Sequence, residues 1–179
     1  MKYIKSYESI DYTKEITYVE NMRALRTEYL RKKKTTSFIK PDPREIEDIR
    51  NKFYDEKNKL RKLIENKFIN EFSKHLELVK TEPDYLIFLL ESDYGIKVEF
   101  EKTGLGNISV KIRTIFVDNR TKDKRFTNGG LLELYKAGQE LSIEDLVSNY
   151  IIRLNKENEI RKRNKEKREF KKSLKKFNI

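Results

Sequence analysis

The spacing of apolar residues changes near Pro83, and this change divides the chain into a helix-forming and a strand-forming part. From Ile46 to Val79, apolar residues recur at three- and four-residue steps, which is the period of an amphipathic helix. From Ile96 to Phe100, every second residue is apolar and the residues between are charged, as in a half-buried strand. The order of the two periods predicts an α+β fold, in which a helix covers the apolar face of a sheet.

A long helix is expected over residues 42–80. Asp42 can cap its start, Pro43 suits the first helical position, and Glu45 lies at the spacing of a capping box. Such a helix would be about 57 Å long at 1.5 Å per residue. Because its first half is poor in apolar groups, we expect that half to project beyond the core and to pair with a helix over residues 13–34 as a helical hairpin.

Three runs after the long helix predict strands. Residues 85–90 are continuously apolar, and residues 96–100 and 108–116 alternate between apolar and polar side chains. The simplest arrangement is a three-stranded antiparallel β-meander over residues 85–117, packed on the helix by its apolar face. The expected turns between the strands are Asp93-Tyr94-Gly95 and Gly104-Leu105-Gly106-Asn107.

The rest of the chain predicts a loop followed by helices. Residues 118–125 are polar and basic, and Asn128-Gly129-Gly130 is typical of a turn. Residues 131–137 favour a short helix closed at Gly138. A final helix over residues 142–154 carries a broad apolar stripe that should pack on the body, and its basic continuation is expected to fray or to become ordered on binding.

The charge is unevenly distributed, and this predicts three regions. The chain has 41 basic and 30 acidic side chains, a net charge of +11. Residues 1–41, with ten basic and five acidic side chains, form a basic N-terminal arm, and residues 42–154, with 20 basic and 21 acidic, form a near-neutral α+β core. Residues 155–179, with eleven basic and four acidic, form a basic helical tail. Basic flanks of this kind attract polyanions by releasing counterions.

Several classes of protein do not fit the composition. No apolar run approaches the roughly 18 residues of a membrane span, and the tail has no continuous apolar face, so no membrane partner is expected. The absence of cysteine and of an apolar leader in the first ten residues suits a reducing, cytoplasmic location. With one histidine and no phosphate-binding glycine motif, neither a metal site nor a cofactor is expected.

The acidic residues of the predicted sheet do not form a catalytic pattern. A metal-dependent nuclease would place a carboxylate two residues before a lysine, and this spacing does not occur on the predicted strand 96–100. The favoured interpretation is a cross-strand charge ladder, in which Lys97, Glu99 and Glu101 face Ser109, Lys111 and Arg113. His75 is interpreted as a surface residue. We therefore expect a protein that is not an enzyme.

The candidate nucleic-acid-binding residues form two basic groups, one in the loop after the predicted sheet and one in the tail. Aromatic residues near them are sparse, which favours contacts with backbone phosphate over stacking on bases. Helical winding would distribute the tail cations around most of the cylinder. The two groups are Arg120, Lys122, Lys124 and Arg125, and then Arg161, Lys162, Arg163, Lys165, Lys167, Arg168, Lys171 and Lys172.

The leading hypothesis is a basic protein that binds nucleic acid, or a nucleoprotein complex, through phosphate contacts. A first alternative is a small inhibitor that docks on a nucleic-acid enzyme. In size and in its Lys-, Asn- and Ile-rich composition the chain is similar to phage-encoded anti-defence proteins of the anti-CRISPR kind, a similarity of style without a shared motif. A second alternative is an assembly protein that self-associates through the long helix as a coiled coil.

Overall fold

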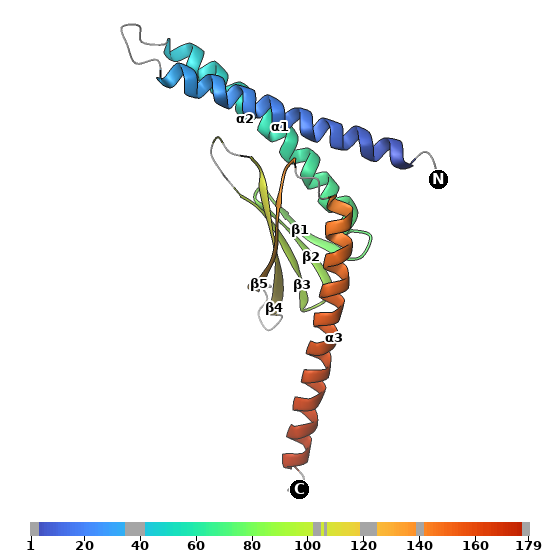
Figure 1. Ribbon diagram of the computed structural model, residues 1–179. Coiled ribbons are helices and arrows are strands. Elements are labelled where there is room, and N and C mark those ends of the chain that lie inside the picture. The colour runs from blue at the N-terminus through green and yellow to red at the C-terminus, as the bar shows by residue number, and fades with distance from the viewer. Residues whose placement is uncertain are drawn as a thin grey trace.

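The computed structural model describes the backbone of residues 4–34, 42–101, 105, 107–118, 125–138 and 142–176, and side chains within these ranges except at 4–12, 131–133 and 175–176. The chain folds as an α+β protein with an antiparallel five-stranded sheet in the order β1-β2-β3-β4-β5 (Figure 1). The predicted class is confirmed, and the sheet has five strands where three were expected. The elements are α1 (Ile4–Lys34), α2 (Pro43–Phe72), β1 (Glu77–Glu82), β2 (Tyr85–Glu91), β3 (Tyr94–Phe100), β4 (Ser109–Asp118), β5 (Arg125–Lys136) and α3 (Ile143–Lys176).

The helices form two groups around the sheet. Helices α1 and α2 lie side by side as a hairpin that extends past one end of the sheet (Figure 1). The second half of α2 and the first half of α3 cover the same face, where Phe68, Leu86 and Leu146 belong to one buried cluster. In the parts of the chain that the structure describes, no helix is both long and apolar enough to cross a membrane.

The hairpin forms as the sequence predicts. Asp42 caps α2 by accepting a hydrogen bond from the Arg44 amide at 2.9 Å. The thin apolar stripes of the two helices cover each other, because Val19 and Met22 of α1 are buried in the cluster that holds Phe53 of α2. Helix α1 is longer than expected, since it begins at Ile4.

Helix α2 ends at Phe72, whereas the sequence predicts a helix to residue 80. The continued three- and four-residue spacing of Leu76 and Val79 suggested more helix, but residues 77–82 form strand β1 and pair with β2. This pairing satisfies backbone groups of β2, and the Phe72 ring packs on Phe88 of β2 at 5.2 Å between centroids. The helix has 30 residues, which corresponds to about 45 Å.

Strand β5 replaces the turn expected at residues 128–130 and the short helix expected at 131–137. The glycines of the Asn-Gly-Gly sequence lie within the strand, where the register with β4 shifts between Arg113 and Ile115. A Cβ on Gly129 would lie 2.2 Å from the Thr114 Oγ1 and 3.1 Å from the Thr114 carbonyl oxygen, so a side chain here would require Thr114 to move. Gly95 is similar, since it lies within β3 and a Cβ would meet the Phe88 carbonyl oxygen at 2.1 Å, whereas the sequence predicts a turn.

Helix α3 continues to Lys176 without interruption, across the predicted boundary at residues 154 and 155. Its start is capped as expected, because the Ser142 Oγ accepts a hydrogen bond from the Glu144 amide at 3.2 Å. The apolar stripe from Ile143 to Leu154 is buried against the sheet and α2, as the sequence predicts. Residues 155–176 are helical, as expected for the basic tail, because lysine, arginine and glutamate are themselves good helix formers. Fraying of this segment in the unbound protein stays a prediction.

Candidate nucleic-acid interface

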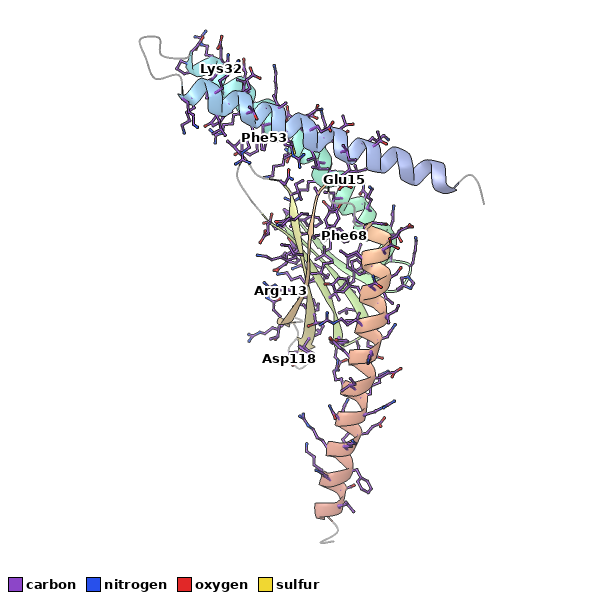
Figure 2. All side chains as sticks on the ribbon, viewed as in Figure 1. Glu15, Lys32, Phe53, Phe68, Arg113 and Asp118 are labelled. Atoms are coloured by element: carbon purple, nitrogen blue, oxygen red, sulfur yellow. The ribbon has the colours of Figure 1, made fainter. Side chains whose placement is uncertain are left out.

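Arg125 and the predicted cations of α3 lie toward one end of the sheet. Asp118 and Arg125 are paired at the adjacent ends of β4 and β5, and Arg125 is exposed. Arg120, Lys122 and Lys124 lie outside the described residues. The other eight predicted residues are on α3, which passes the same end of the sheet and extends well beyond it (Figure 2).

Arg161 joins α3 to this end of the sheet. Its guanidinium forms an ion pair with Asp93, in the turn between β2 and β3, and lies 5.0 Å from the centre of the Tyr94 ring and 5.8 Å from that of Phe116. The Asp93 carbonyl accepts a hydrogen bond from the Val117 amide at 3.0 Å, next to the end of β4. Arg161 is therefore engaged within the protein.

Lys162 and Asn158 contact Glu91 at the same end of the sheet. We call these contacts, together with that of Arg161 with Asp93, the joint. The Lys162 ammonium lies 2.5 Å from the Glu91 carboxylate, and the Asn158 side-chain amide donates to the same group at 2.9 Å. Lys162 and then Asn158 lower the pKa of Glu91 from its ordinary value. Tyr94 adds a hydrogen bond from its hydroxyl to Glu157 at 3.1 Å, and burial raises the pKa of Tyr94.

The distal segment of α3, residues 163–176, carries the remaining six predicted cations. It has eight basic and two acidic residues, and its basic side chains through Lys172 are exposed. Within the part of the chain that the structure describes, no ion pair joins these six side chains to a carboxylate. The six are Arg163, Lys165, Lys167, Arg168, Lys171 and Lys172.

These six cations form two rows along the helix. At about 100° per residue, the first row is Arg163, Lys167 and Lys171, and the second, about 130° away around the axis, is Lys165, Arg168 and Lys172. The opposite side of the distal segment carries no cation among its described side chains, although Lys162, one residue before the segment, lies at that angle. With Arg161 and Lys162 included, the predicted cations of α3 occupy most of the cylinder, as expected, and the two rows describe the distal segment alone. The opposite side consists of Glu166, Glu169, Phe170 and Ser173.

The second row continues the side of α3 that contacts the sheet. Leu154, Asn158 and Arg161 lie on this side, followed by Lys165 and Arg168 at steps of four and three residues. The side is apolar where it meets the core, polar at the edge of the sheet and cationic beyond it. The three- and four-residue spacing was present in the sequence and could have been used to identify the rows.

Carboxylates of the sheet pair with neighbouring cations. The predicted charge ladder is confirmed, because Glu99 lies 2.7 Å from the Lys97 ammonium and 3.0 Å from Arg113 Nε, and Glu101 pairs with Lys111. His75 is exposed in the turn after α2. Among the described residues, no group of three His, Asp or Glu side chains is arranged to hold a metal ion.

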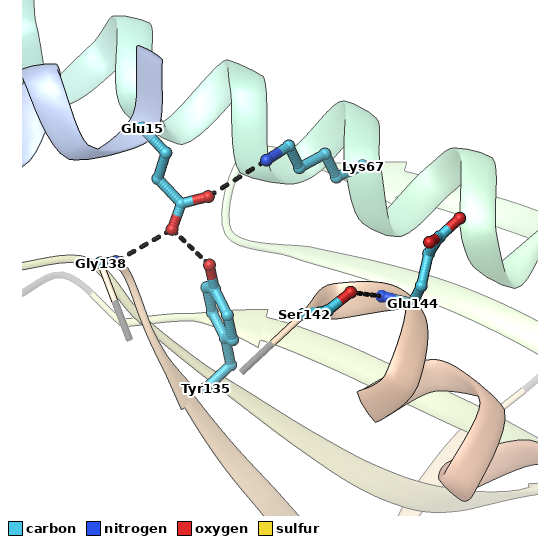
Figure 3. Close-up of polar contacts among 6 residues, drawn as sticks. All are labelled: Glu15, Lys67, Tyr135, Gly138, Ser142 and Glu144. Carbon is cyan, nitrogen blue, oxygen red and sulfur yellow. Dashed lines mark hydrogen bonds and ion pairs between the residues drawn. The ribbon is translucent and has the colours of Figure 1, made fainter. Parts of the chain in front are cut away.

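The buried carboxylate of Glu15 has a structural role, which sequence analysis did not detect. It is 2% exposed and accepts hydrogen bonds from the Tyr135 hydroxyl and from the Gly138 amide at 2.9 Å, and it lies 3.2 Å from the Lys67 ammonium (Figure 3). The three donors come from β5, the turn that follows it and α2. Glu15 therefore fixes α1 to the rest of the molecule, across sequence separations that no local pattern reports.

A depression on the described surface lies between α1 and α2. It is shallow, has a volume of about 420 Å³, and is lined by both acidic and basic side chains, including Asp55, Glu56 and Lys59. It has neither the enclosure nor the convergent polar groups of a small-molecule site.

Comparison of the chain with protein-family models, curated proteins and solved structures gives no match.

Proposed function

We propose that this protein is a non-enzymatic binder of nucleic acid, free or within a nucleoprotein complex, and that the distal segment of α3 makes the phosphate contacts. One observation carries the proposal: six exposed cations, which have no carboxylate partner among the described residues, project from a helix whose first half is fixed to the core. Exposed cations on a rigid support attract phosphates and gain free energy when the nucleic acid releases its counterions.

The joint with the sheet supports this division of roles. Arg161 and Lys162 balance Asp93 and Glu91, so the cations beyond them are left for an external partner. Among the described residues of the distal segment, Phe170 is the one aromatic side chain. A single ring is a poor platform for stacking successive bases. Contacts with the phosphate backbone are therefore the expected mode.

The proposal is tested by fluorescence anisotropy with labelled DNA and RNA, double- and single-stranded, over a series of salt concentrations. The wild-type chain should bind at low salt, and for duplex DNA the slope of log K against log salt should be about −0.9 per phosphate contacted. A variant with all six cations of the two rows changed to Gln should lose at least 100-fold in affinity at low salt.

A control variant changes three exposed cations of the helical hairpin instead. Arg26, Lys52 and Lys62 are exposed and lie outside α3. The triple variant R26Q/K52Q/K62Q should bind within about two-fold of wild type. Absence of wild-type binding to every nucleic acid would overturn the proposal, and so would equal affinity in the six-residue variant. The predicted alternatives, docking on a protein partner and self-association, would then be tested by pull-down and sedimentation.

A further inference from the structure

We infer that the nucleic acid is duplex DNA and that the distal segment of α3 lies in its major groove, an inference that rests on the proposed function. The starting observation is the division of the cations into two rows about 130° apart around the helix axis. A single strand or a flat anionic surface contacts one side of a helix, so one row would serve it. Two rows of cations on the two flanks of one helix match a groove that has phosphates along both of its sides.

The dimensions fit a B-form groove. A helix with its side chains is about 10–12 Å across, and the major groove of B-DNA is about 12 Å wide. The rows extend from Arg163 to Lys172, a rise of about 14 Å, and successive cations in a row are three or four residues apart. The major groove of A-form RNA is deep and narrow and does not admit a helix in this way. Duplex DNA is thus favoured over duplex RNA.

The residues between and behind the rows fix which side enters the groove. Asn164 lies between the two rows, on the side that would face the base edges. An asparagine amide can pair with the N6 and N7 atoms of adenine in the major groove. Glu166 and Glu169 lie on the opposite side, where they would point away from the phosphates. A polyanion approaching that side would be repelled.

The end of the sheet is compatible with a duplex beside it. The distal segment extends past the sheet, away from the other described elements (Figure 1). The second row lies on the side of α3 that faces the sheet, so one DNA strand would pass near the exposed Arg125 at the start of β5. The nearby carboxylates of Glu91 and Asp93 are already paired with Lys162 and Arg161, which reduces their repulsion of phosphate.

The test compares a 20-base-pair DNA duplex, an RNA duplex of the same sequence and the single strands, using the full chain and anisotropy. DNA duplex should bind at least ten-fold more tightly than the RNA duplex and the single strands. The major-groove ligand methyl green should compete with the protein, whereas the minor-groove ligand netropsin should not. Equal or tighter binding of RNA or of single strands would overturn the inference, as would competition by netropsin alone.

Two triple variants test whether both rows of cations contact the DNA. R163Q/K167Q/K171Q and K165Q/R168Q/K172Q each remove one arginine and two lysines, as the R26Q/K52Q/K62Q control does. Each row variant should weaken binding to DNA duplex by a similar factor and reduce the salt slope by about 2–3, and the control should do neither. Loss of affinity in one row variant alone would indicate contact with a single side and would overturn the groove arrangement.

Asn164→Ala tests the direction in which the helix faces. It should leave the salt slope unchanged and reduce the preference among DNA duplexes that differ in their A·T content, because it removes a base contact and no charge. An unchanged preference would overturn the assignment of Asn164 to the floor of the groove. Failure of the proposed function differs from all these results, since the wild-type chain would then bind none of the nucleic acids.

Discussion

The two halves of α3 have the same secondary structure and opposite environments. The proximal segment, residues 143–162, buries Val147, Tyr150 and Leu154 against the sheet and α2. The distal segment is exposed on all sides through Lys172. The helix does not break between them, because lysine, arginine and glutamate sustain it without burial. The difference shows that packing fixes the direction of this helix, whereas local propensity accounts for its length.

The change between the halves is gradual along one side of the helix. Leu154 is buried and apolar, Asn158 is buried and hydrogen-bonded to Glu91, and Arg161 is half-buried and paired with Asp93. Lys165, one turn further, is exposed. The burial of these side chains decreases along the helix as their polarity increases, so no sharp boundary separates core from solvent on this side.

The largest expected effect on stability comes from truncating a buried apolar side chain of the proximal segment, and truncating an exposed one of the distal segment is the comparison. Leu154 is 1% exposed and Phe170 is 64% exposed. Leu154→Ala should reduce the free energy of unfolding by about 2–5 kcal/mol, because it leaves a cavity. Phe170→Ala should change it by less than about 0.5 kcal/mol. Urea denaturation followed by circular dichroism measures both. Similar losses in the two variants would mean that the distal segment also packs on a surface, such as that of a second copy.

A smaller effect is expected at the joint. Arg161→Ala removes a partly exposed ion pair with Asp93 and the stacking on Tyr94 and Phe116, so it should cost about 1 kcal/mol. Arg168→Ala, two turns further, removes the same side chain where it has no partner among the described residues, and should leave stability unchanged. The same urea titrations measure the difference. If Arg168→Ala destabilises as much as Arg161→Ala, the distal segment is not free.

The parts of the fold that sequence predicts are those with a local signal. The start of α2 was found because Asp42 and Pro43 are next to each other, and the buried stripe of α3 because its spacing follows a helix. Strands β1 and β5 were missed for a physical reason: both are edge strands whose conformation depends on pairing with a neighbour. Locally, residues 77–80 continue a helical spacing and residues 128–130 favour a turn, and the tertiary pairing outweighs both preferences.

The candidate interface divides in the same way. The basic tail could be identified from composition, and its two rows follow from helical spacing once the helix is known to continue. The engagement of Arg161 and Lys162 could not be predicted, because their partners Asp93 and Glu91 are 68 and 71 residues away in the chain. Composition alone therefore assigns the eight predicted cations of the tail to one role, whereas the fold separates two that pair with the sheet from six that have no carboxylate partner among the described residues.

The smallest expected effect is a pH dependence of stability caused by Glu91, which contacts Lys162 where the two segments of α3 meet. Lys162 is the main cause of the lowered pKa of Glu91, and Asn158 is the second. A carboxyl group with a pKa lower in the folded than in the unfolded state stabilises the fold above its unfolded pKa, about 4.3. That contribution is lost as the pH falls through the lowered folded pKa. Protonation of Glu91 should therefore weaken the joint only in acid.

Lys162→Met tests this linkage. It should raise the pKa of Glu91 towards its ordinary value and make the protein slightly less stable at neutral pH, with a difference from wild type that closes as the pH falls below about 4. Lys165→Met is the matched control, because it removes an exposed cation of the distal segment less than one turn away. Its stability should follow that of wild type at every pH. Carboxyl chemical shifts and urea titrations between pH 3 and 7 distinguish the two variants. An equal pH dependence of stability in both variants would show that Lys162 stabilises the Glu91 carboxylate no more than Lys165 does.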